Sequence, residues 1–147
     1  MRTFLSLILL LIFSLAAHAE VRTEDVSYEI DGEAFTGYLA YDDSISGKRP
    51  AVLVVHDWWG LSDYEKRRAR MLAELGYVAF AVDMYGTGKH TVNPDQAKAW
   101  MQAVTTGVEW WRERAMSGGE ILRGTQLADA AKVAAIGFCL GGGTVVQ

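Results

Sequence analysis

The stretch that most constrains the fold is Gly137-Phe138-Cys139-Leu140-Gly141, near the end of the 147-residue chain. It follows a short apolar run, Val133 to Ile136, and continues into further glycines. This pattern predicts a buried strand that turns sharply into a helix, with Cys139 at the apex. Gly137 and Gly141 stand where a Cβ would collide with its neighbours in so tight a turn.

The position of Cys139 predicts a nucleophile. Unpaired N–H groups in the first turn of a helix favour a thiolate, and the N–H of Leu140 would face a developing oxyanion. Two other interpretations compete, a small buried hydrophobe and a dinucleotide-binding loop. The loop is excluded because G-x-G-x-x-G would need a glycine at Cys139 or at Val146.

The N-terminus has the features of an export signal. Arg2 gives a positive start, Phe4 to Leu15 is apolar, and Ala17-His18-Ala19 is an A-x-A cleavage site. We therefore expect residues 1–19 to be a signal peptide cleaved near Ala19, leaving a periplasmic or secreted protein. The apolar stretch is short for a membrane span, although an uncleaved anchor is the alternative.

Composition limits the function classes. A net charge of −4 without a basic run argues against nucleic acid as a partner, and 50% hydrophobic residues argue against disorder. The single cysteine excludes an internal disulfide, and an unpaired thiol in an oxidising compartment favours a chemical role. The sequence shows neither a metal-ligand cluster nor a phosphate loop, so we expect no cofactor.

The order of predicted elements indicates an α/β fold. Alternation predicts a β-hairpin from Val26–Ile30 and Phe35–Tyr41, and continuous apolar runs predict buried strands at Ala51–Val55 and Tyr77–Val82. A capping box at Ser62–Glu65 begins a helix that ends at Gly76. Two more helices are expected, from Asn93-Pro94 to about Val104 and over Val108–Leu122, with a weak point at Gly118-Gly119. The expected buried faces are Met71, Leu72 and Leu75 on the first helix and Val108, Trp111, Ala115 and Leu122 on the last.

Chemistry-bearing residues follow the buried strands, at the sheet edge where α/β proteins bind ligands. Asp57 is either a site carboxylate or a loop brace, and Asp83 is expected to brace its turn. His56 is either a base for Cys139 or a histidine satisfied by backbone groups. Trp58 and Trp59 either line an apolar substrate pocket or pack in the core.

Three motifs together resemble the dienelactone hydrolase family: Val54–Leu61, Ala81–Gly86 and Ile136–Gly142. The resemblance covers about Val26 to Gln147 and implies an α/β-hydrolase fold with a cysteine nucleophile. The family's triad runs Cys, Asp, His along the chain. In members of the family, a carboxylate at the end of the first central strand also holds the resting thiol.

The resemblance implies a role for each matching residue. Cys139 matches the nucleophile, and Asp57 matches the holding carboxylate, where the family usually has Glu. The N–H groups of Leu140 and Trp58 match the oxyanion hole. Lys89 is the nearest candidate for the basic residue that contacts the substrate carboxylate.

The chain ends at Gln147, before the strands expected to carry the triad Asp and His. The expected fold is therefore the N-terminal portion of an α/β hydrolase, an incomplete domain over residues 20–147 that ends at the turn containing Cys139. We expect a hydrolase of small lactones or carboxylic esters that acts through a Cys139 acyl-enzyme, with His90 as a surface residue. The alternatives are an inactive truncated module that self-associates through an exposed sheet edge, and a single-cysteine redox sensor.

Overall fold

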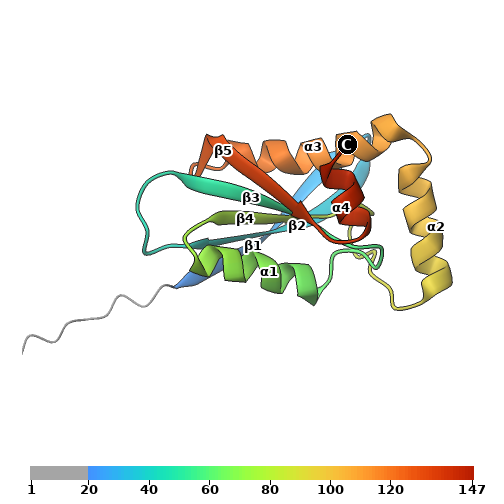
Figure 1. The fold of residues 1–147 in the computed structure, drawn as a ribbon, viewed down its shortest axis with the longest axis horizontal. Coiled ribbons are helices and arrows are strands. Elements are labelled where there is room, and N and C mark those ends of the chain that lie inside the picture. The colour runs from blue at the N-terminus through green and yellow to red at the C-terminus, as the bar shows by residue number, and fades with distance from the viewer. Residues whose placement is uncertain (1–19) are drawn as a thin grey trace, which may run out of the picture.

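The structure is a computed structural model that describes residues 20–147; the predicted signal peptide, residues 1–19, lies outside the described residues. It is a five-stranded sheet flanked by helices (Figure 1). The strands are β1 (Val21–Ile30), β2 (Glu33–Asp42), β3 (Arg49–Val55), β4 (Val78–Val82) and β5 (Ala128–Gly137). The helices are α1 (Asp63–Glu74), α2 (Pro94–Thr105), α3 (Val108–Gly124) and α4 (Leu140–Val145).

The predicted hairpin is confirmed, and both of its strands are longer than expected. β1 and β2 pair antiparallel along their whole lengths. Asp31 and Gly32 connect them with φ angles of 49° and 80°. Two successive positive φ angles give a turn whose twist matches that of the strands, which explains why an Asp-Gly pair stands there.

The rest of the sheet is mainly parallel, and the strand order of the whole sheet is β1-β2-β4-β3-β5. β3 lies between β4 and β5, so that Leu53 pairs with Phe80 on one side and Ala135 on the other. Its apolar run is buried, as the sequence predicts. β5 is the edge strand of the described sheet, which confirms the expected place of the strand before Cys139.

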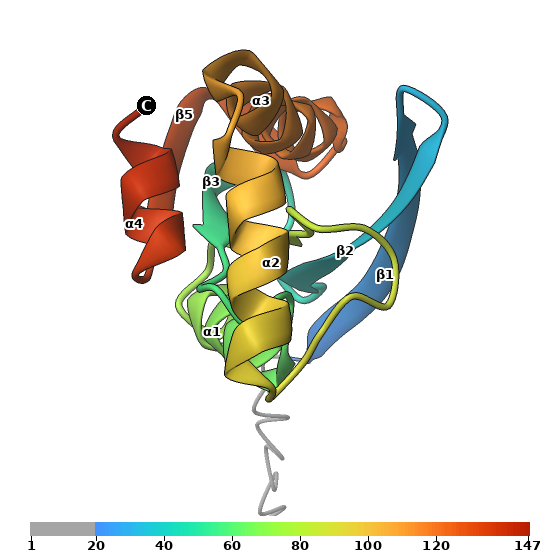
Figure 2. The same ribbon diagram turned by 90° about the vertical axis from the view of Figure 1, so that its right-hand side faces the viewer.

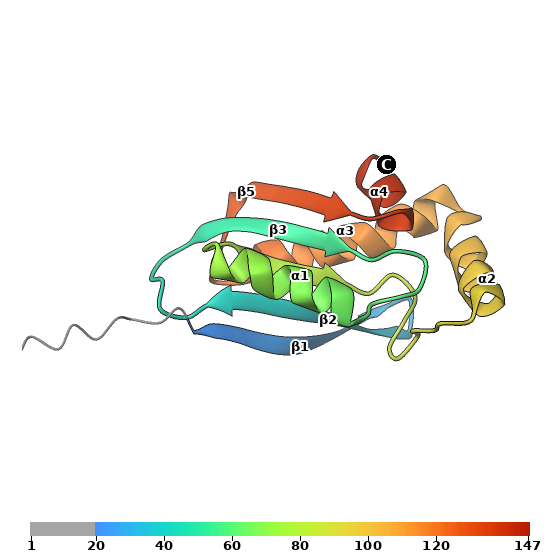
Figure 3. The ribbon, with the colours of Figure 1, turned by 60° about the horizontal axis from the view of Figure 1, so that its bottom comes forward.

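Helix α1 covers one face of the sheet and α3 the other (Figures 1 and 3). The capping box of α1 is confirmed: the Ser62 hydroxyl accepts from the Tyr64 N–H at 3.2 Å, and Glu65 accepts from the Ser62 N–H at 3.0 Å. This arrangement pairs N–H groups that the first turn of the helix cannot pair by itself.

The expected buried face of α1 is wrong for two of its three residues. Met71 and Leu75 are 40% and 73% exposed, whereas Leu72 packs against the core. The residues buried against the sheet are Glu65, Ala69 and Ala73, spaced four apart on one side of the helix. The small alanine side chains let the helix lie close to the sheet, and the larger apolar side chains are displaced toward solvent.

Helix α3 is continuous through Gly118 and Gly119, where a weak point is expected. Gly118 lies so close to β4 that a Cβ there would be 2.5 Å from Val82 Cγ2. The glycine therefore permits close packing of the helix on the sheet. Leu122 is buried and Trp111 and Ala115 pack on the core as expected, but Val108 is 46% exposed because it lies at the start of the helix.

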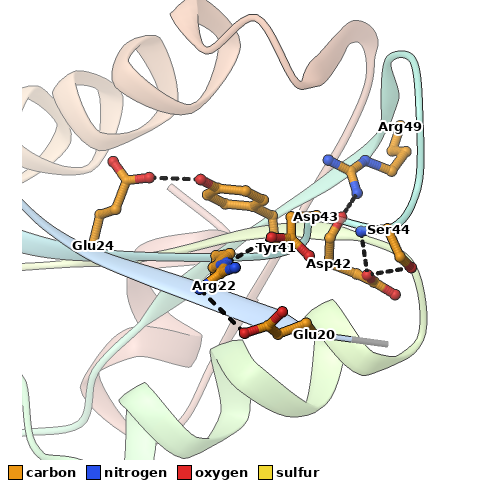
Figure 4. A network of polar contacts seen from close by, with 8 residues as sticks. All are labelled: Glu20, Arg22, Glu24, Tyr41, Asp42, Asp43, Ser44 and Arg49. Carbon is orange, nitrogen blue, oxygen red and sulfur yellow. Dashed lines mark hydrogen bonds and ion pairs between the residues drawn. The ribbon is translucent and has the colours of Figure 1, made fainter. Parts of the chain in front are cut away.

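A polar network ties the strands together where β1 and β3 begin and β2 ends (Figure 4). The buried Arg49 guanidinium donates to the Asp42 carbonyl, and Ser44 donates to the Asp42 carboxylate from its N–H and its hydroxyl. Arg22 pairs with Asp43 at 2.5 Å. The opposite end of β3 is thus left for the candidate site.

Within residues 20–147, no helix is both long and apolar enough to cross a bilayer.

Candidate functional site

Three turns follow the parallel strands at one end of the sheet, after β3, β4 and β5. Because these strands run in the same direction, their carboxyl ends meet at one edge, where open α/β sheets bind ligands. Figure 2 views the molecule from this end, with α2 in front and α4 beside β5. The residues predicted to form the site lie in these turns.

The turn after β5 has the conformation that its sequence predicts. Cys139 is exposed. Its φ of 53° and ψ of −112° lie outside the backbone regions that residues other than glycine ordinarily adopt. A Cβ on Gly137 would collide with the backbone of Gly141 and lie 2.7 Å from Gly142 N. Strain of this kind persists only where the surroundings enforce it.

Gly141 is required for a different contact from the one expected. A Cβ there would collide first with the carbonyl oxygens of Val55 and His56, the latter at 2.7 Å. The start of α4 therefore packs directly on the end of β3. This contact brings Cys139 and the turn after β3 together.

Helix α4 is anchored by a chain of hydrogen bonds to α3. The Trp111 indole N–H donates to the Thr144 hydroxyl at 2.8 Å, and this hydroxyl donates to the Leu140 carbonyl at 2.9 Å. The Leu140 N–H donates no hydrogen bond within the described protein. It is therefore free to bind an oxygen next to Cys139, as the predicted oxyanion hole requires.

His56 is fully buried, and both of its ring nitrogens are occupied. Nε2 accepts from the Met84 N–H at 3.0 Å, and Nδ1 lies 2.5 Å from the Asp57 carbonyl oxygen. Because an N–H can only donate, Nε2 carries the lone pair and Nδ1 the proton. Burial lowers the pKa of His56, which keeps the ring neutral. His56 is thus a histidine satisfied by backbone groups, and the hypothesis that it serves Cys139 as a base is wrong.

Asp57 has the bracing contact that one interpretation of the sequence expects. Its Oδ1 accepts from the Trp59 N–H at 2.8 Å, which closes the turn after β3. In the described part of the chain, no hydrogen bond joins Asp57 to Cys139. Its role as the carboxylate that holds the thiol stays a prediction.

Tyr85 is a site residue that the sequence analysis missed. Its hydroxyl donates to the Trp58 carbonyl oxygen at 3.0 Å. Burial raises the pKa of Tyr85, and the negative charges of Asp57 and Cys139 raise it further. Both charges therefore lie within electrostatic reach of this hydroxyl. The available signal was the position of Tyr85 directly after β4, in the turn that Asp83 begins.

Asp83 braces the turn after β4, as predicted. Its Oδ1 accepts from the N–H groups of Tyr85 and Gly86, both at 2.9 Å. Its Oδ2 accepts from the Thr36 N–H at 3.3 Å. These bonds fix the backbone from which Tyr85 projects.

The predicted substrate-binding residues lie in the turn after β3 and in the loop after β4. The ring centroids of Trp58 and Trp59 are 4.7 Å apart, and Trp58 also packs on the core. Lys89 is on the exposed loop between β4 and α2, and it lines a cavity of about 210 Å³ with Tyr85 and Trp100. Within residues 20–147, no hydrogen bond or ion pair joins Lys89 to Cys139. His90 is exposed on the same loop, as expected.

No cluster of three or more His, Cys, Asp or Glu side chains within residues 20–147 is arranged to hold a metal ion. The described residues provide an exposed thiol, that of Cys139, beside the free N–H of Leu140.

Comparison with known proteins matches residues 35–147 to the dienelactone hydrolase family. A protein of Aquifex aeolicus named as a carboxymethylenebutenolidase is 33% identical over 121 residues, which are 80% of this chain and 51% of that protein. The usf protein of Aquifex pyrophilus is 31% identical over the same shares of the two chains.

Among solved structures, a dienelactone hydrolase-like promiscuous phosphotriesterase from metagenomic libraries is 35% identical, with a TM-score of 0.81. The match covers 86% of this chain and 52% of that one. A structure called m3DLH is 34% identical, with a TM-score of 0.82 and the same coverage. The chain spans about half the length of these relatives.

Proposed function

The chain belongs to the dienelactone hydrolase family, and from this premise we propose that Cys139 is the nucleophile of a hydrolase that cleaves small lactones or carboxylic esters. The observation that carries the proposal is the positive φ of Cys139 at an exposed, glycine-bounded apex. Such a conformation presents the thiol to a substrate. The name of the Aquifex aeolicus relative supports a lactone among the substrates.

The reaction has two steps. The Cys139 thiolate attacks the carbonyl carbon, and the resulting oxyanion accepts hydrogen bonds from the N–H groups of Leu140 and Trp58. Collapse of this intermediate restores the C=O bond and breaks the bond to the alkoxide, which leaves with a proton. Water then attacks the thioester and gives up a proton, and the carboxylic acid and the thiolate are released.

The proton relay requires a base other than His56, because both ring nitrogens of His56 are occupied. By resemblance to the family, we assign this role to a histidine that follows the nucleophile, in the half of the relatives that the present chain does not span. The first step needs only an ionised thiol and the two N–H groups. It can therefore be tested on this chain.

The test is a burst of p-nitrophenol from p-nitrophenyl acetate, followed by mass spectrometry of the protein. We expect one acetyl group on Cys139 of the wild-type chain and none on Cys139→Ala. Equal bursts from the two proteins would contradict the proposal. Stoichiometric oxidation of the thiol by dilute peroxide without any acylation would favour the redox sensor instead.

Lys89 and Trp59 are proposed to bind the substrate. The Lys89 ammonium lines the same cavity as Tyr85, whose hydroxyl contacts the Trp58 peptide. A substrate carboxylate could pair with this cation. Lys89→Gln should slow the acylation of Cys139 by an anionic ester and leave acylation by its neutral methyl ester unchanged.

A second proposal concerns assembly and rests on the free edge of β5. In the described sheet β5 has a neighbour only on its β3 side, and Ala130, Ala131, Ala134 and Ala135 are exposed. A groove of about 260 Å³ beside it is lined by Val133, Met116 and Val145, among others. Unpaired backbone beside apolar surface favours pairing with another chain. Sedimentation of residues 20–147 as a stable monomer with a sharp, reversible thermal transition would contradict this.

Export is proposed from the sequence of residues 1–19 alone. Expression of the whole chain in a bacterium should yield a periplasmic form that begins at Glu20. N-terminal sequencing checks this, and a product that retains residues 1–19 in the membrane fraction would indicate the uncleaved anchor.

A further inference from the structure

We infer that His56 and Tyr85 are positioning residues that hold the Trp58 N–H ready for an oxyanion. The inference rests on the proposed function, because an oxyanion hole has a role only if Cys139 attacks a carbonyl. It is carried by the hydrogen bonds of the two peptide groups that flank Trp58.

The first peptide group joins Asp57 to Trp58. Its carbonyl oxygen lies 2.5 Å from His56 Nδ1, which carries the ring proton. Its N–H, that of Trp58, donates no hydrogen bond within the described protein. In a trans peptide the C=O and N–H point in opposite directions, so fixing the oxygen also fixes the direction of the N–H. A hydrogen bond to the oxygen also polarises the group and makes the N–H a better donor.

The second peptide group joins Trp58 to Trp59 and is held at both ends. Its carbonyl accepts from the Tyr85 hydroxyl at 3.0 Å, and its N–H donates to Asp57 Oδ1 at 2.8 Å. Rotation about either backbone bond of Trp58 would break one of these contacts. The free N–H therefore lies between two fixed groups.

The side chains of His56 and Tyr85 are themselves fixed in place by the turn after β4. His56 accepts from the Met84 N–H at 3.0 Å and is fully buried, and Tyr85 is 2% exposed. Their rings meet edge to face, with centroids 4.8 Å apart. The donor is thus positioned by β3 and β4, whereas the nucleophile is carried by β5. A fixed donor needs no rearrangement when charge develops, which is the condition for effective electrostatic stabilisation.

Two reactions of Cys139 distinguish positioning from general structural support. Acylation by p-nitrophenyl acetate passes through an oxyanion, whereas alkylation by iodoacetamide occurs at a saturated carbon and does not. Tyr85→Phe should slow acylation about tenfold, part of the effect of losing an oxyanion donor outright. Its alkylation rate should stay within about twofold of the wild-type value, because the thiol itself is unchanged.

Tyr28→Phe is the matched control. The Tyr28 hydroxyl also donates to a backbone carbonyl after β4, that of Asp83, at 3.0 Å, but it does not contact the Trp58 peptides. Tyr28→Phe should therefore leave both reactions unchanged. His56→Gln, whose amide can still donate and accept, should slow acylation less than His56→Leu.

Equal slowing of acylation and alkylation in Tyr85→Phe would overturn the inference, as would unchanged acylation. If the wild-type chain is alkylated but never acylated, the proposed function fails for this chain, and the inference is decided by NMR. The Trp58 amide resonance should then move in Tyr85→Phe and stay fixed in Tyr28→Phe. An unmoved Trp58 resonance in both variants would overturn the positioning role.

Discussion

The turns after β3 and β5 meet at the candidate site, yet they are fixed in different ways. The turn after β3 is held by hydrogen bonds from His56, Asp57 and Tyr85 to its backbone. The turn after β5 has no side-chain hydrogen bond at Cys139 and is shaped by close contacts of Gly137 and Gly141. The turn after β3 therefore depends on hydrogen-bond partners, whereas the turn after β5 depends on glycines, which have no side chain.

This difference matches what each turn provides. The turn after β3 offers a backbone N–H, whose direction is set by bonds to neighbouring atoms. The turn after β5 offers a side chain, which must remain free of bonds in order to react. Steric closure constrains the backbone of Cys139 and leaves its thiol unengaged.

The largest effect is expected from Gly137→Ala. The added Cβ would collide with the backbone of Gly141, which cannot rotate away as a side chain can. We expect a loss of about 3 kcal/mol or more in the free energy of unfolding, measured by urea denaturation. Gly143→Ala is the control, since its Cβ would lie 3.6 Å from Trp111 in ordinary contact. Equal stability of the two variants would contradict steric closure of this turn.

His56→Leu should have the next largest effect, because it leaves two backbone groups without their hydrogen-bond partner. The buried Met84 N–H and the Asp57 carbonyl would each lose a hydrogen bond. A loss of about 3 kcal/mol is expected, and His56→Gln should recover more than half of it. Should the leucine variant prove as stable as the glutamine variant, these hydrogen bonds would not be what holds the turn.

The same histidine predicts a dependence on pH. Burial lowers the pKa of His56 in the folded protein below its ordinary value of 6.5. The unfolded chain therefore binds the proton more readily, and folded stability falls as pH drops below about 6.5. The expected extra loss is up to about 1.4 kcal/mol per pH unit relative to His56→Gln. Parallel curves of unfolding free energy against pH for the two proteins would show that His56 does not titrate in this way.

Asp57→Asn should have the smallest effect on stability, within about 0.5 kcal/mol, because the amide oxygen can still accept from the Trp59 N–H. Its effect on the thiol tests the holding role. If Asp57 holds the resting thiol, the asparagine variant should release Cys139 for reaction. Iodoacetamide should then alkylate Cys139 faster at pH 7. An unchanged rate would leave Asp57 as a brace of the turn only.

The local parts of the fold were predictable from sequence. The Ser62–Glu65 capping box, the Asp31-Gly32 turn and the close contact of Gly137 with Gly141 each depend on neighbouring residues, and each occurs as expected. The buried face of α1 was not predictable from hydrophobicity, because close approach to the sheet selects Ala69 and Ala73 over larger side chains.

The sequence offered bracing roles for Asp57 and Asp83, but the partners of His56 and Tyr85 were beyond it. The His56 to Met84 bond joins residues 28 positions apart, and the Tyr85 to Trp58 bond joins residues 27 apart. Both depend on the register between β3 and β4, which a motif does not specify. The sequence therefore located the turn after β3, and only the structure reveals what holds it.

The pairing of β3 with β5 has a consequence for the order of folding. Val54 pairs with Ile136, so this contact closes a loop that contains α1, β4, α2 and α3. The bonds of the turn after β3 need only β3 and β4, which are joined by the single helix α1. Shorter loops close at a lower entropic cost, so the turn can form before β5 arrives. During refolding, the Met84 N–H, which donates to His56, should therefore become protected from hydrogen exchange before the N–H groups of β5 do.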